Sequence, residues 1–211
     1  MAGGPSVTVY RAEFSTNCER VGLALAHKGI DANSVLIEYS NRAPVEAVSG
    51  QGLVPVVIDG ATVVHDSVAI LRYLDQRTPD PPLFPADPLR RAELDLFVDW
   101  FERIWKWAPN TIEDELEREE PDAALVERCS AQLRGRLDRF ESLLDGRDFL
   151  WGDQFGAADC VAYPFLKYAA GRDPADEELF HVILDERQPL GDDHARLRAW
   201  IERVSERPRA Y

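Results

Sequence analysis

The stretch from residue 52 to residue 74 places the tightest constraint on what this chain can fold into. It opens with a short, β-branched apolar run at 53–58, which predicts a buried strand. Asp59-Gly60 follows and predicts a two-residue type I′ turn, because both turn positions need positive φ. Residues 61–64 predict the returning strand, and Asp66-Ser67 is an N-cap signature before a helical apolar pattern. The stretch therefore predicts a β-hairpin followed by a helix.

Pro55 is unusual inside a strand run because it has no N–H to donate to a neighbouring strand. It predicts an edge, a strand start or a cis bond, and any of these leaves the backbone of Val54 free to pair with something else. Asp66-Ser67 places free N–H groups and a helix dipole where they suit a carboxylate. A free extended edge beside an anion site is typical of a receptor for a short acidic peptide. The structural alternative is an ordinary edge strand followed by a capped helix.

The rest of the first half predicts a strand at 7–10, a helix at 16–29, a strand at 33–39 and a short helix at 43–48. With the hairpin and its helix, the order is βαβ-α-ββα, which is the thioredoxin-like α/β arrangement. Four prolines within 79–86 cannot continue a helix, and they predict a stiff linker. We therefore expect a first domain at 1–78.

Residues 87–211 predict an all-α domain, a helical bundle. Apolar residues at helical spacing form two stripes and a final helix; they are Leu94, Phe97, Phe101, Ile104 and Trp105, then Leu125, Cys129, Leu133, Leu137, Phe140 and Leu144, and last Leu197, Trp200, Ile201 and Val204. Residues 109–120 are acidic and predict a frayed helix end or a solvated loop. Asp159 is placed as the acid of a capping box, which is a structural role.

Composition restricts the partners of the chain. Its 211 residues carry a net charge of −14 at pH 7, which disfavours nucleic acid and anionic lipid as partners. The 3 cysteines are an odd number, and neither they nor the 4 histidines show a metal-binding spacing. This pattern favours a reducing cytoplasm and no metal. The N-terminal residues lack a secretory signal pattern, and no apolar run reaches the roughly 20 residues of a membrane span.

The Val-Pro pair, hairpin, Asp-Ser pair and helix together resemble the glutathione-binding half of the cytosolic glutathione transferases. FLWGDQFGAAD and LRAWIERVSERPRA resemble later parts of the same family, so the resemblance covers nearly the whole chain. It implies a thioredoxin-like first domain, an all-helical second domain that contributes a hydrophobic substrate pocket, and a homodimer. One departure is Gly156, where the family usually has Ser or Thr; glycine is also an acceptable N-cap.

The resemblance also implies how glutathione would bind. Pro55 would be cis, the backbone of Val54 would pair with the cysteinyl unit, and Asp66 and Ser67 would hold the γ-glutamyl end. Gln51 would lie near the glycyl end. The family often has a polar residue where this chain has Leu53, so recognition of the glycyl carboxylate and the identity of the thiol stay open.

The loop between the first strand and the first helix is where this topology presents reactive groups. Ser15-Thr16-Asn17-Cys18 takes the place of a thioredoxin-like Cys-x-x-Cys, and it resembles transferases in which a serine hydrogen-bonds the glutathione sulfur. A hydroxyl is not basic at pH 7, so Ser15 would donate a hydrogen bond to the thiolate once formed. Such a bond contributes roughly 1.5–3 kcal/mol and lowers a thiol pKa by roughly one to two units. Thr16 is the fallback donor.

The sequence thus predicts a glutathione transferase that conjugates a small hydrophobic electrophile. Two alternatives stay open. One is a thiol-dependent cis–trans isomerase of a maleyl compound, partly matched because Asn17 stands where such members have cysteine. The other is a non-catalytic binding protein on the same fold. Trp100, Trp105 and Trp107 are candidates for an aromatic pocket, although most such residues belong to a core, and we expect only one of them to line it.

Overall fold

A computed structural model describes residues 7–211. The chain forms two compact units, of which the first runs to Ala86 and also includes Arg207–Tyr211, and the second is Asp87–Glu206. No helix within the described residues is long and apolar enough to cross a membrane. The expected lack of a secretory signal concerns in part residues 1–6, which lie outside the described residues.

The first unit is a four-stranded mixed sheet with three helices, in the βαβ-α-ββα order that the sequence predicts. Its elements are β1 (Val7–Arg11), α1 (Thr16–His27), β2 (Ala32–Leu36), α2 (Ala43–Ser49), β3 (Val56–Asp59), β4 (Thr62–His65) and α3 (Ser67–Arg77). The strands lie in the order β2-β1-β3-β4. β1 runs parallel to β2 and antiparallel to β3, and β3 is antiparallel to β4. The predicted thioredoxin-like arrangement is therefore confirmed.

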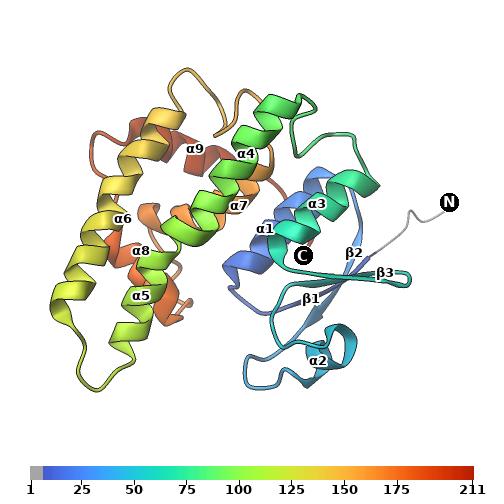
Figure 1. The fold of residues 1–211 in the computed structure, drawn as a ribbon, viewed down its shortest axis with the longest axis horizontal. Helices are drawn as coiled ribbons and strands as arrows, with labels where there is room; N and C mark the ends of the chain where they lie inside the picture. Colours follow the sequence, from blue (N-terminus) through green and yellow to red (C-terminus); the bar gives the residue numbers. More distant parts are fainter. Residues whose placement is uncertain (1–6) are drawn as a thin grey trace. The chain divides into compact units, whose positions relative to one another are not determined.

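Helices cover both faces of this sheet. Figure 1 shows α1 and α3 on one face and α2 on the other. A cluster of buried apolar residues packs around α2; its members are Ala12, Ile37, Val45 and Val56. The alternation of side chains along a strand explains why each inner strand contributes to both faces.

The hairpin turn differs from its prediction by one residue. Asp59 pairs with Thr62, so the two loop residues are Gly60 and Ala61 rather than Asp59 and Gly60. Gly60 has φ of 60°, and neither Asp59 nor Ala61 has positive φ. A glycine with positive φ at the first of two loop positions is the requirement of a type II′ turn. The predicted type I′ turn is therefore wrong, although the hairpin itself is present.

The proline-rich segment 79–86 is attached to the first unit. Lys28 Nζ lies 2.6 Å from Asp75 Oδ1 and 2.6 Å from the carbonyl oxygen of Pro81. The N–H of Leu83 donates to the same Asp75 oxygen at 2.7 Å, and Leu83 is buried. A buried lysine needs such partners because desolvation of its charge is costly. The segment that we proposed as a linker is thus fixed at Pro81 and Leu83.

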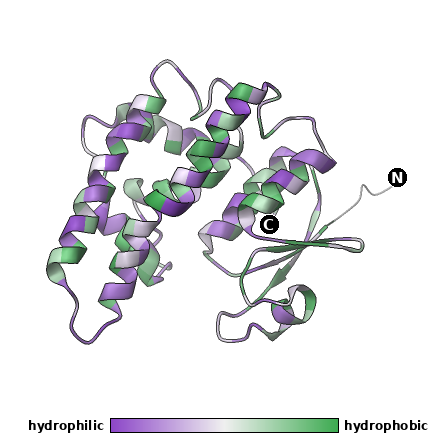
Figure 2. Ribbon diagram, viewed as in Figure 1, coloured by the Kyte–Doolittle hydropathy of each residue, from purple (hydrophilic) through white to green (hydrophobic). Residues whose placement is uncertain are grey.

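The second unit is helical. Its helices are α4 (Pro88–Trp100), η1 (Phe101–Trp105, a π-helical turn), α5 (Trp107–Leu116), α6 (Ala123–Leu143), α7 (Ala157–Leu166), η2 (Lys167–Ala170), α8 (Leu179–Arg187) and α9 (Ala195–Ser205). Figure 2 shows hydrophobic and hydrophilic residues interleaved along these helices. Most of the predicted stripe positions are buried, which agrees with an amphipathic bundle.

Two predictions for the second unit are wrong. Ile104 was expected in the first stripe but is half exposed, because the π-helical turn at Phe101–Trp105 changes the helical phase. Residues 109–120 were expected to be frayed or solvated, but most of them belong to α5. Pro109 is tolerated there because it lies in the first turn of α5, and Ile112 and Glu115 are buried.

Asp159 stabilises the start of α7, as its capping-box position predicts. Its carboxylate accepts the N–H of Gly156 at 2.9 Å, the N–H of Leu150 at 3.0 Å and the indole N–H of Trp200 at 2.8 Å. Asp159 and every other residue of α7 are buried. The side chain therefore links the start of α7 to α9.

Candidate functional site

Three loops meet at one end of the sheet in the first unit. Tyr10 of β1 lies opposite Val56 of β3, and Val56 lies opposite His65 of β4. Because both pairings are antiparallel, the chain leaves β1, enters β3 and leaves β4 at the same end. Ser15, Val54 and Asp66-Ser67 follow or precede these three positions by a few residues. The strand register therefore places the predicted catalytic and binding residues near the same end of the sheet.

Ser15 is the N-cap of α1, and Thr16 is its first residue. Ser15 Oγ accepts the N–H of Cys18 at 3.3 Å, which satisfies one of the free N–H groups at the helix start. The hydroxyl proton of Ser15 stays available as a donor. Ser15 is half-buried, whereas Thr16 is buried. The preceding residue, Phe14, has φ of 55°, a conformation that is uncommon for a residue with a side chain.

The Val54–Pro55 peptide bond is cis, as the family resemblance implies. No backbone hydrogen bond joins Val54 to the rest of the described residues. Leu53 exposes 71% of its surface, but its backbone is occupied: its N–H donates to Gln51 Oε1 at 2.6 Å and its carbonyl accepts from Gln51 Nε2 at 2.9 Å. Gln51 therefore supports the loop that enters β3, and the backbone N–H and carbonyl groups of Val54 stay unpaired within the described residues.

Asp66 and Ser67 begin α3. Asp66 has φ of 71° and its Oδ1 accepts the N–H of Ala69 at 2.9 Å, so it is a side-chain N-cap. Ser67 is the first residue of the helix and is buried. Its Oγ accepts a hydrogen bond at 3.1 Å from Nη1 of Arg20, which lies on α1. The two helix starts are thus joined by a buried polar contact.

Arg20 is a residue of this site that our reasoning from the sequence did not assign. It is fully buried, with no exposed surface. The spacing in the sequence could have predicted this burial. Arg20 lies four residues after Thr16 and four before Ala24, so the three residues share one face of α1, and this face is buried. An arginine on an apolar helix face needs a buried acceptor, and Ser67 provides one.

Cys18 is suited to packing rather than to redox chemistry. It is buried, and burial raises the pKa of its thiol above the ordinary value, although the hydrogen bond with Ser15 opposes this shift. A thiol that stays protonated is a poor nucleophile. Cys18 therefore fills space in the core of the first unit.

The second unit contains an apolar cavity of about 620 Å³ between α4 and α6. Trp100 is the one of the three candidate tryptophans that lines this cavity, together with Phe97, Leu96 and Trp151. Trp105 is fully buried instead, with its ring stacked on Phe101 at a centroid distance of 4.5 Å. Trp107 is half exposed on α5.

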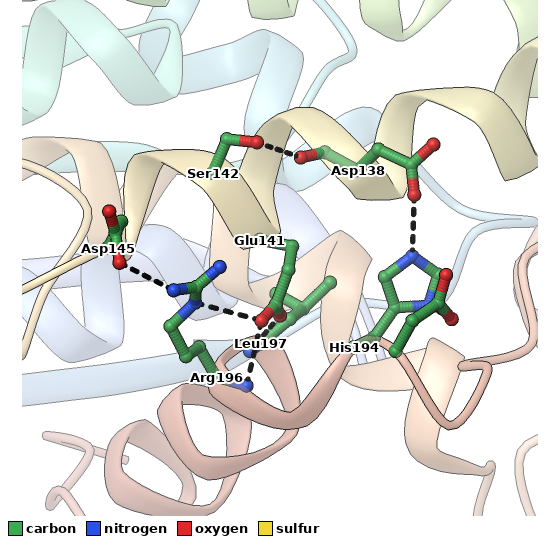
Figure 3. Close-up of polar contacts among 8 residues, drawn as sticks. Asp138, Glu141, Ser142, Asp145, His194, Arg196 and Leu197 are labelled. Atoms are coloured by element: carbon green, nitrogen blue, oxygen red, sulfur yellow. Dashed lines mark hydrogen bonds and ion pairs between the residues drawn. The ribbon is translucent and has the colours of Figure 1, made fainter.

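Asp138, Asp193 and His194 are close enough to consider as cation ligands, since one atom from each lies within 4.8 Å of the others. Figure 3 shows His194 directed at Asp138, with Nε2 3.0 Å from Oδ1. The N–H of Gly191 donates to Nδ1 of the same ring at 3.0 Å. Nδ1 is therefore the acceptor and Nε2 carries the proton, so neither nitrogen offers a lone pair to a cation. The ring is engaged in joining α6 to the start of α9.

A thioredoxin-like sheet with a cis-proline, an unpaired Val54 edge and a serine at the start of α1, followed by a helical unit, defines the glutathione transferase class. The chain belongs to the glutathione S-transferase family. The family's N-terminal domain matches residues 9–82, and its C-terminal domain matches residues 104–208.

Named relatives and solved structures are similar to the chain over different lengths. FtsZ-localized protein A of Caulobacter vibrioides is 27% identical over 171 residues, 75% of each chain. Glutathione S-transferase Z1 of Arabidopsis thaliana is 34% identical over 95 residues, 43% of each chain. A solved glutathione S-transferase from Rhodospirillum rubrum has 26% identity and a TM-score of 0.74, covering 96% of this chain and 89% of the other.

Proposed function

We propose that this protein binds glutathione at the sheet end described above and activates its thiol for attack on a small hydrophobic electrophile. The observation that carries the proposal is the arrangement of Ser15. Its Oγ accepts the N–H of Cys18, which fixes the oxygen at the N-terminus of α1 and leaves the hydroxyl proton for donation to the glutathione sulfur. A thiolate at that position gains both the hydrogen bond and the helix dipole.

Binding in the proposed complex uses the first unit alone. The unpaired backbone of Val54 pairs with the cysteinyl unit of glutathione, as in an added strand. The γ-glutamyl carboxylate lies at the start of α3, where the Ser67 hydroxyl and the free N–H groups are donors. Gln51 holds Leu53 and so fixes the direction of the Val54 edge.

The proposed reaction is a nucleophilic substitution or addition. Ser15 stabilises the thiolate, and the thiol proton is released to water. The sulfur electron pair forms the new S–C bond, and with an aryl chloride the chloride departs with the electron pair of the broken C–Cl bond. The free, buried cysteines support a reducing compartment such as the cytoplasm.

The test combines retention on immobilised glutathione with turnover of chlorodinitrobenzene. We expect retention, turnover, and a fall of roughly 10- to 100-fold in kcat/KM for Ser15→Ala, the equivalent of one charged hydrogen bond. Ser205→Ala, an exposed serine at the end of α9 and outside the cavity, is the control and should change nothing. Absence of both retention and turnover in the wild-type protein contradicts the proposal.

A non-catalytic binding protein is the second candidate, and one observation favours it. FtsZ-localized protein A, which matches three quarters of the chain, does not have the name of a transferase. Retention on glutathione without turnover, and with equal affinity in Ser15→Ala, would support this candidate. Turnover of a maleyl compound without consumption of the thiol would instead support the isomerase alternative.

We also propose a homodimer in which the α4–α6 cavity faces a second copy of the chain. Leu96 borders the cavity and exposes 72% of its surface. Glu93 of α4 and Arg139 of α6 line the same cavity. In a two-fold contact α4 of one copy meets α6 of the other, so these opposite charges would pair twice.

The mass in solution tests the dimer. Light scattering should give twice the 23.8 kDa of one chain for the wild type and for Leu116→Asp, which replaces an exposed leucine of α5 outside the cavity. Leu96→Asp should give the mass of one chain, because it places two carboxylates in the contact. A monomeric wild type, or a Leu96→Asp variant that remains dimeric, contradicts this assignment.

A further inference from the structure

The segment Arg207–Tyr211 follows α9 of the second unit in sequence but packs on the first unit. The N–H of Ala210 donates to the carbonyl oxygen of Gly22 at 3.1 Å, and Arg209 Nη2 lies 2.8 Å from Glu19 Oε1. Residues 209–211 therefore lie along the first half of α1, the helix that Ser15 caps.

Tyr211 contacts both ends of the loop that carries Ser15. Its hydroxyl donates to the carbonyl oxygen of Cys18 in the first turn of α1, at 2.7 Å. The guanidinium of Arg11, the last residue of β1, lies 5.0 Å from the centre of its ring. Such a distance permits a cation–π interaction. The Tyr211 side chain thus contacts both β1 and α1, the two elements that residues 12–15 connect.

Gly22 makes this close packing possible. A Cβ at Gly22 would lie 3.3 Å from Cε2 of Tyr211, which is tighter than ordinary packing allows. The ring therefore occupies the space that a side chain would take on any other residue. This glycine lies within α1, where glycine lowers helix stability by roughly 1 kcal/mol relative to alanine, so its presence fits a packing role.

The loop between the two contacts needs external support. Phe14 has φ of 55° and is exposed, so the packing of its own side chain contributes little to holding this conformation. Ser15 Oγ is placed by the N–H of Cys18, the same residue whose carbonyl accepts from Tyr211. The position of the Ser15 hydroxyl thus depends on how firmly the first turn of α1 is held.

We propose that Tyr211 is a positioning residue for Ser15, and that it holds the loop at 12–15 in the geometry in which the serine hydroxyl meets the glutathione sulfur. This inference rests on the proposed function. Within the described residues, Tyr211 has no hydrogen bond or ring contact with Val54, Asp66 or Ser67, the residues that we assign to glutathione binding. Loss of the tyrosine should therefore change activation of the thiol and leave binding of the tripeptide in place.

The test compares Tyr211→Phe, Tyr211→Ala and Arg207→Gln with the wild type. Tyr211→Phe removes the hydrogen bond and keeps the ring over Arg11, and we expect kcat to fall about fivefold, the equivalent of one neutral hydrogen bond. Tyr211→Ala also removes the ring and should lower kcat further. Arg207→Gln is the matched control, because Arg207 lies in the same segment but contacts His27 at the other end of α1.

Three readouts separate positioning from a general loss of structure. The dissociation constant of S-methylglutathione should stay within twofold in all variants, while the pKa of the bound glutathione thiol rises in both Tyr211 variants. Amide hydrogen exchange of residues 12–18 should be faster in Tyr211→Phe than in Arg207→Gln. This last measurement needs no activity, and Tyr211→Phe serves if Tyr211→Ala does not fold.

The outcomes distinguish the inference from the function on which it rests. If Ser15→Ala raises the thiol pKa but Tyr211→Phe and Tyr211→Ala leave it unchanged, the positioning role is wrong and the proposed function stands. If Ser15→Ala also leaves the thiol pKa unchanged, both fail. Equal exchange rates at 12–18 in Tyr211→Phe and Arg207→Gln likewise contradict the positioning role.

Discussion

Arg20 and Ser67 are joined across the starts of α1 and α3, with Nη1 of the arginine 3.1 Å from Oγ of the serine. A guanidinium can only donate, so Ser67 Oγ is the acceptor in this pair. The hydroxyl proton of Ser67 is consequently directed elsewhere, and it is available to the γ-glutamyl carboxylate in the proposed complex. Arg20 thus orients the serine and adds positive charge near the anion site.

The first prediction concerns this pair. Ser67→Ala should weaken glutathione binding by roughly 10-fold or more, because it removes a hydrogen bond to a charged group. Arg20→Lys should weaken it less than Arg20→Met, since lysine keeps the charge. If the arginine acts through the serine, the double variant Arg20→Met/Ser67→Ala should have about the same affinity for glutathione as the single variant with the lower affinity. Calorimetric titration measures each affinity, and strictly additive losses would contradict the coupling.

The second prediction concerns the pH dependence of stability. Burial raises the pKa of Asp159 from 3.8 to about 6, against the opposing effect of the hydrogen bonds that its carboxylate accepts. Between these values the folded carboxyl is protonated while the unfolded one is ionised, so the folded state binds more protons. The stability from this group is fully present below the unfolded pKa and is lost as pH rises through the folded pKa.

Asp159→Asn removes this titration. We expect the free energy of unfolding of the wild type, relative to the variant, to increase by about 1.4 kcal/mol for each pH unit lowered within that window. Urea unfolding at several pH values measures the difference, and groups common to both proteins cancel. A difference that stays constant across the window would show that the buried carboxyl does not titrate there.

The third prediction compares a buried ion pair with an exposed one of the same length. Lys28–Asp75 is buried and Arg103–Asp99 is exposed, and both pairs are 2.6 Å long. Lys28→Met should destabilise the protein by about 3 kcal/mol or more, because it leaves the Asp75 charge buried without its partner. Arg103→Ala should cost no more than about 0.5 kcal/mol. Equal effects of the two substitutions in chemical unfolding would contradict the structural role of the buried pair.

Much of the fold follows from local patterns in the sequence. Three kinds of local pattern predict their elements to within a few residues. They are the alternation and turn residues of the hairpin, the capping residues Asp66 and Asp159, and the apolar stripes of the helices. The failures occurred where a competing local rule applied. Gly60 could begin or end a two-residue turn, and only the pairing of Asp59 with Thr62 decides between them.

The candidate site was less accessible to sequence reasoning where it depends on contacts distant in the chain. Arg20 and Ser67 are 47 residues apart, and Cys18 and Tyr211 are 193 apart. Helical and strand periodicity relate residues only a few positions apart, so neither pattern predicts these contacts. Likewise, the π-helical turn at Phe101–Trp105 moved Ile104 out of its predicted stripe through a change in helical phase.

Activation of the thiol depends most on the serine at the start of α1, and one measurement tests this role directly. The ultraviolet absorbance of the thiolate, titrated against pH with glutathione bound, gives the pKa of the thiol in the complex. For the wild type we expect a value roughly one to two units below the 8.5 or so of a free thiol. Ser15→Ala should return it close to that of the free thiol, while Thr16→Ser keeps the lowered value. An unshifted thiol in the wild type, or an equal shift in Ser15→Ala, would contradict the central claim.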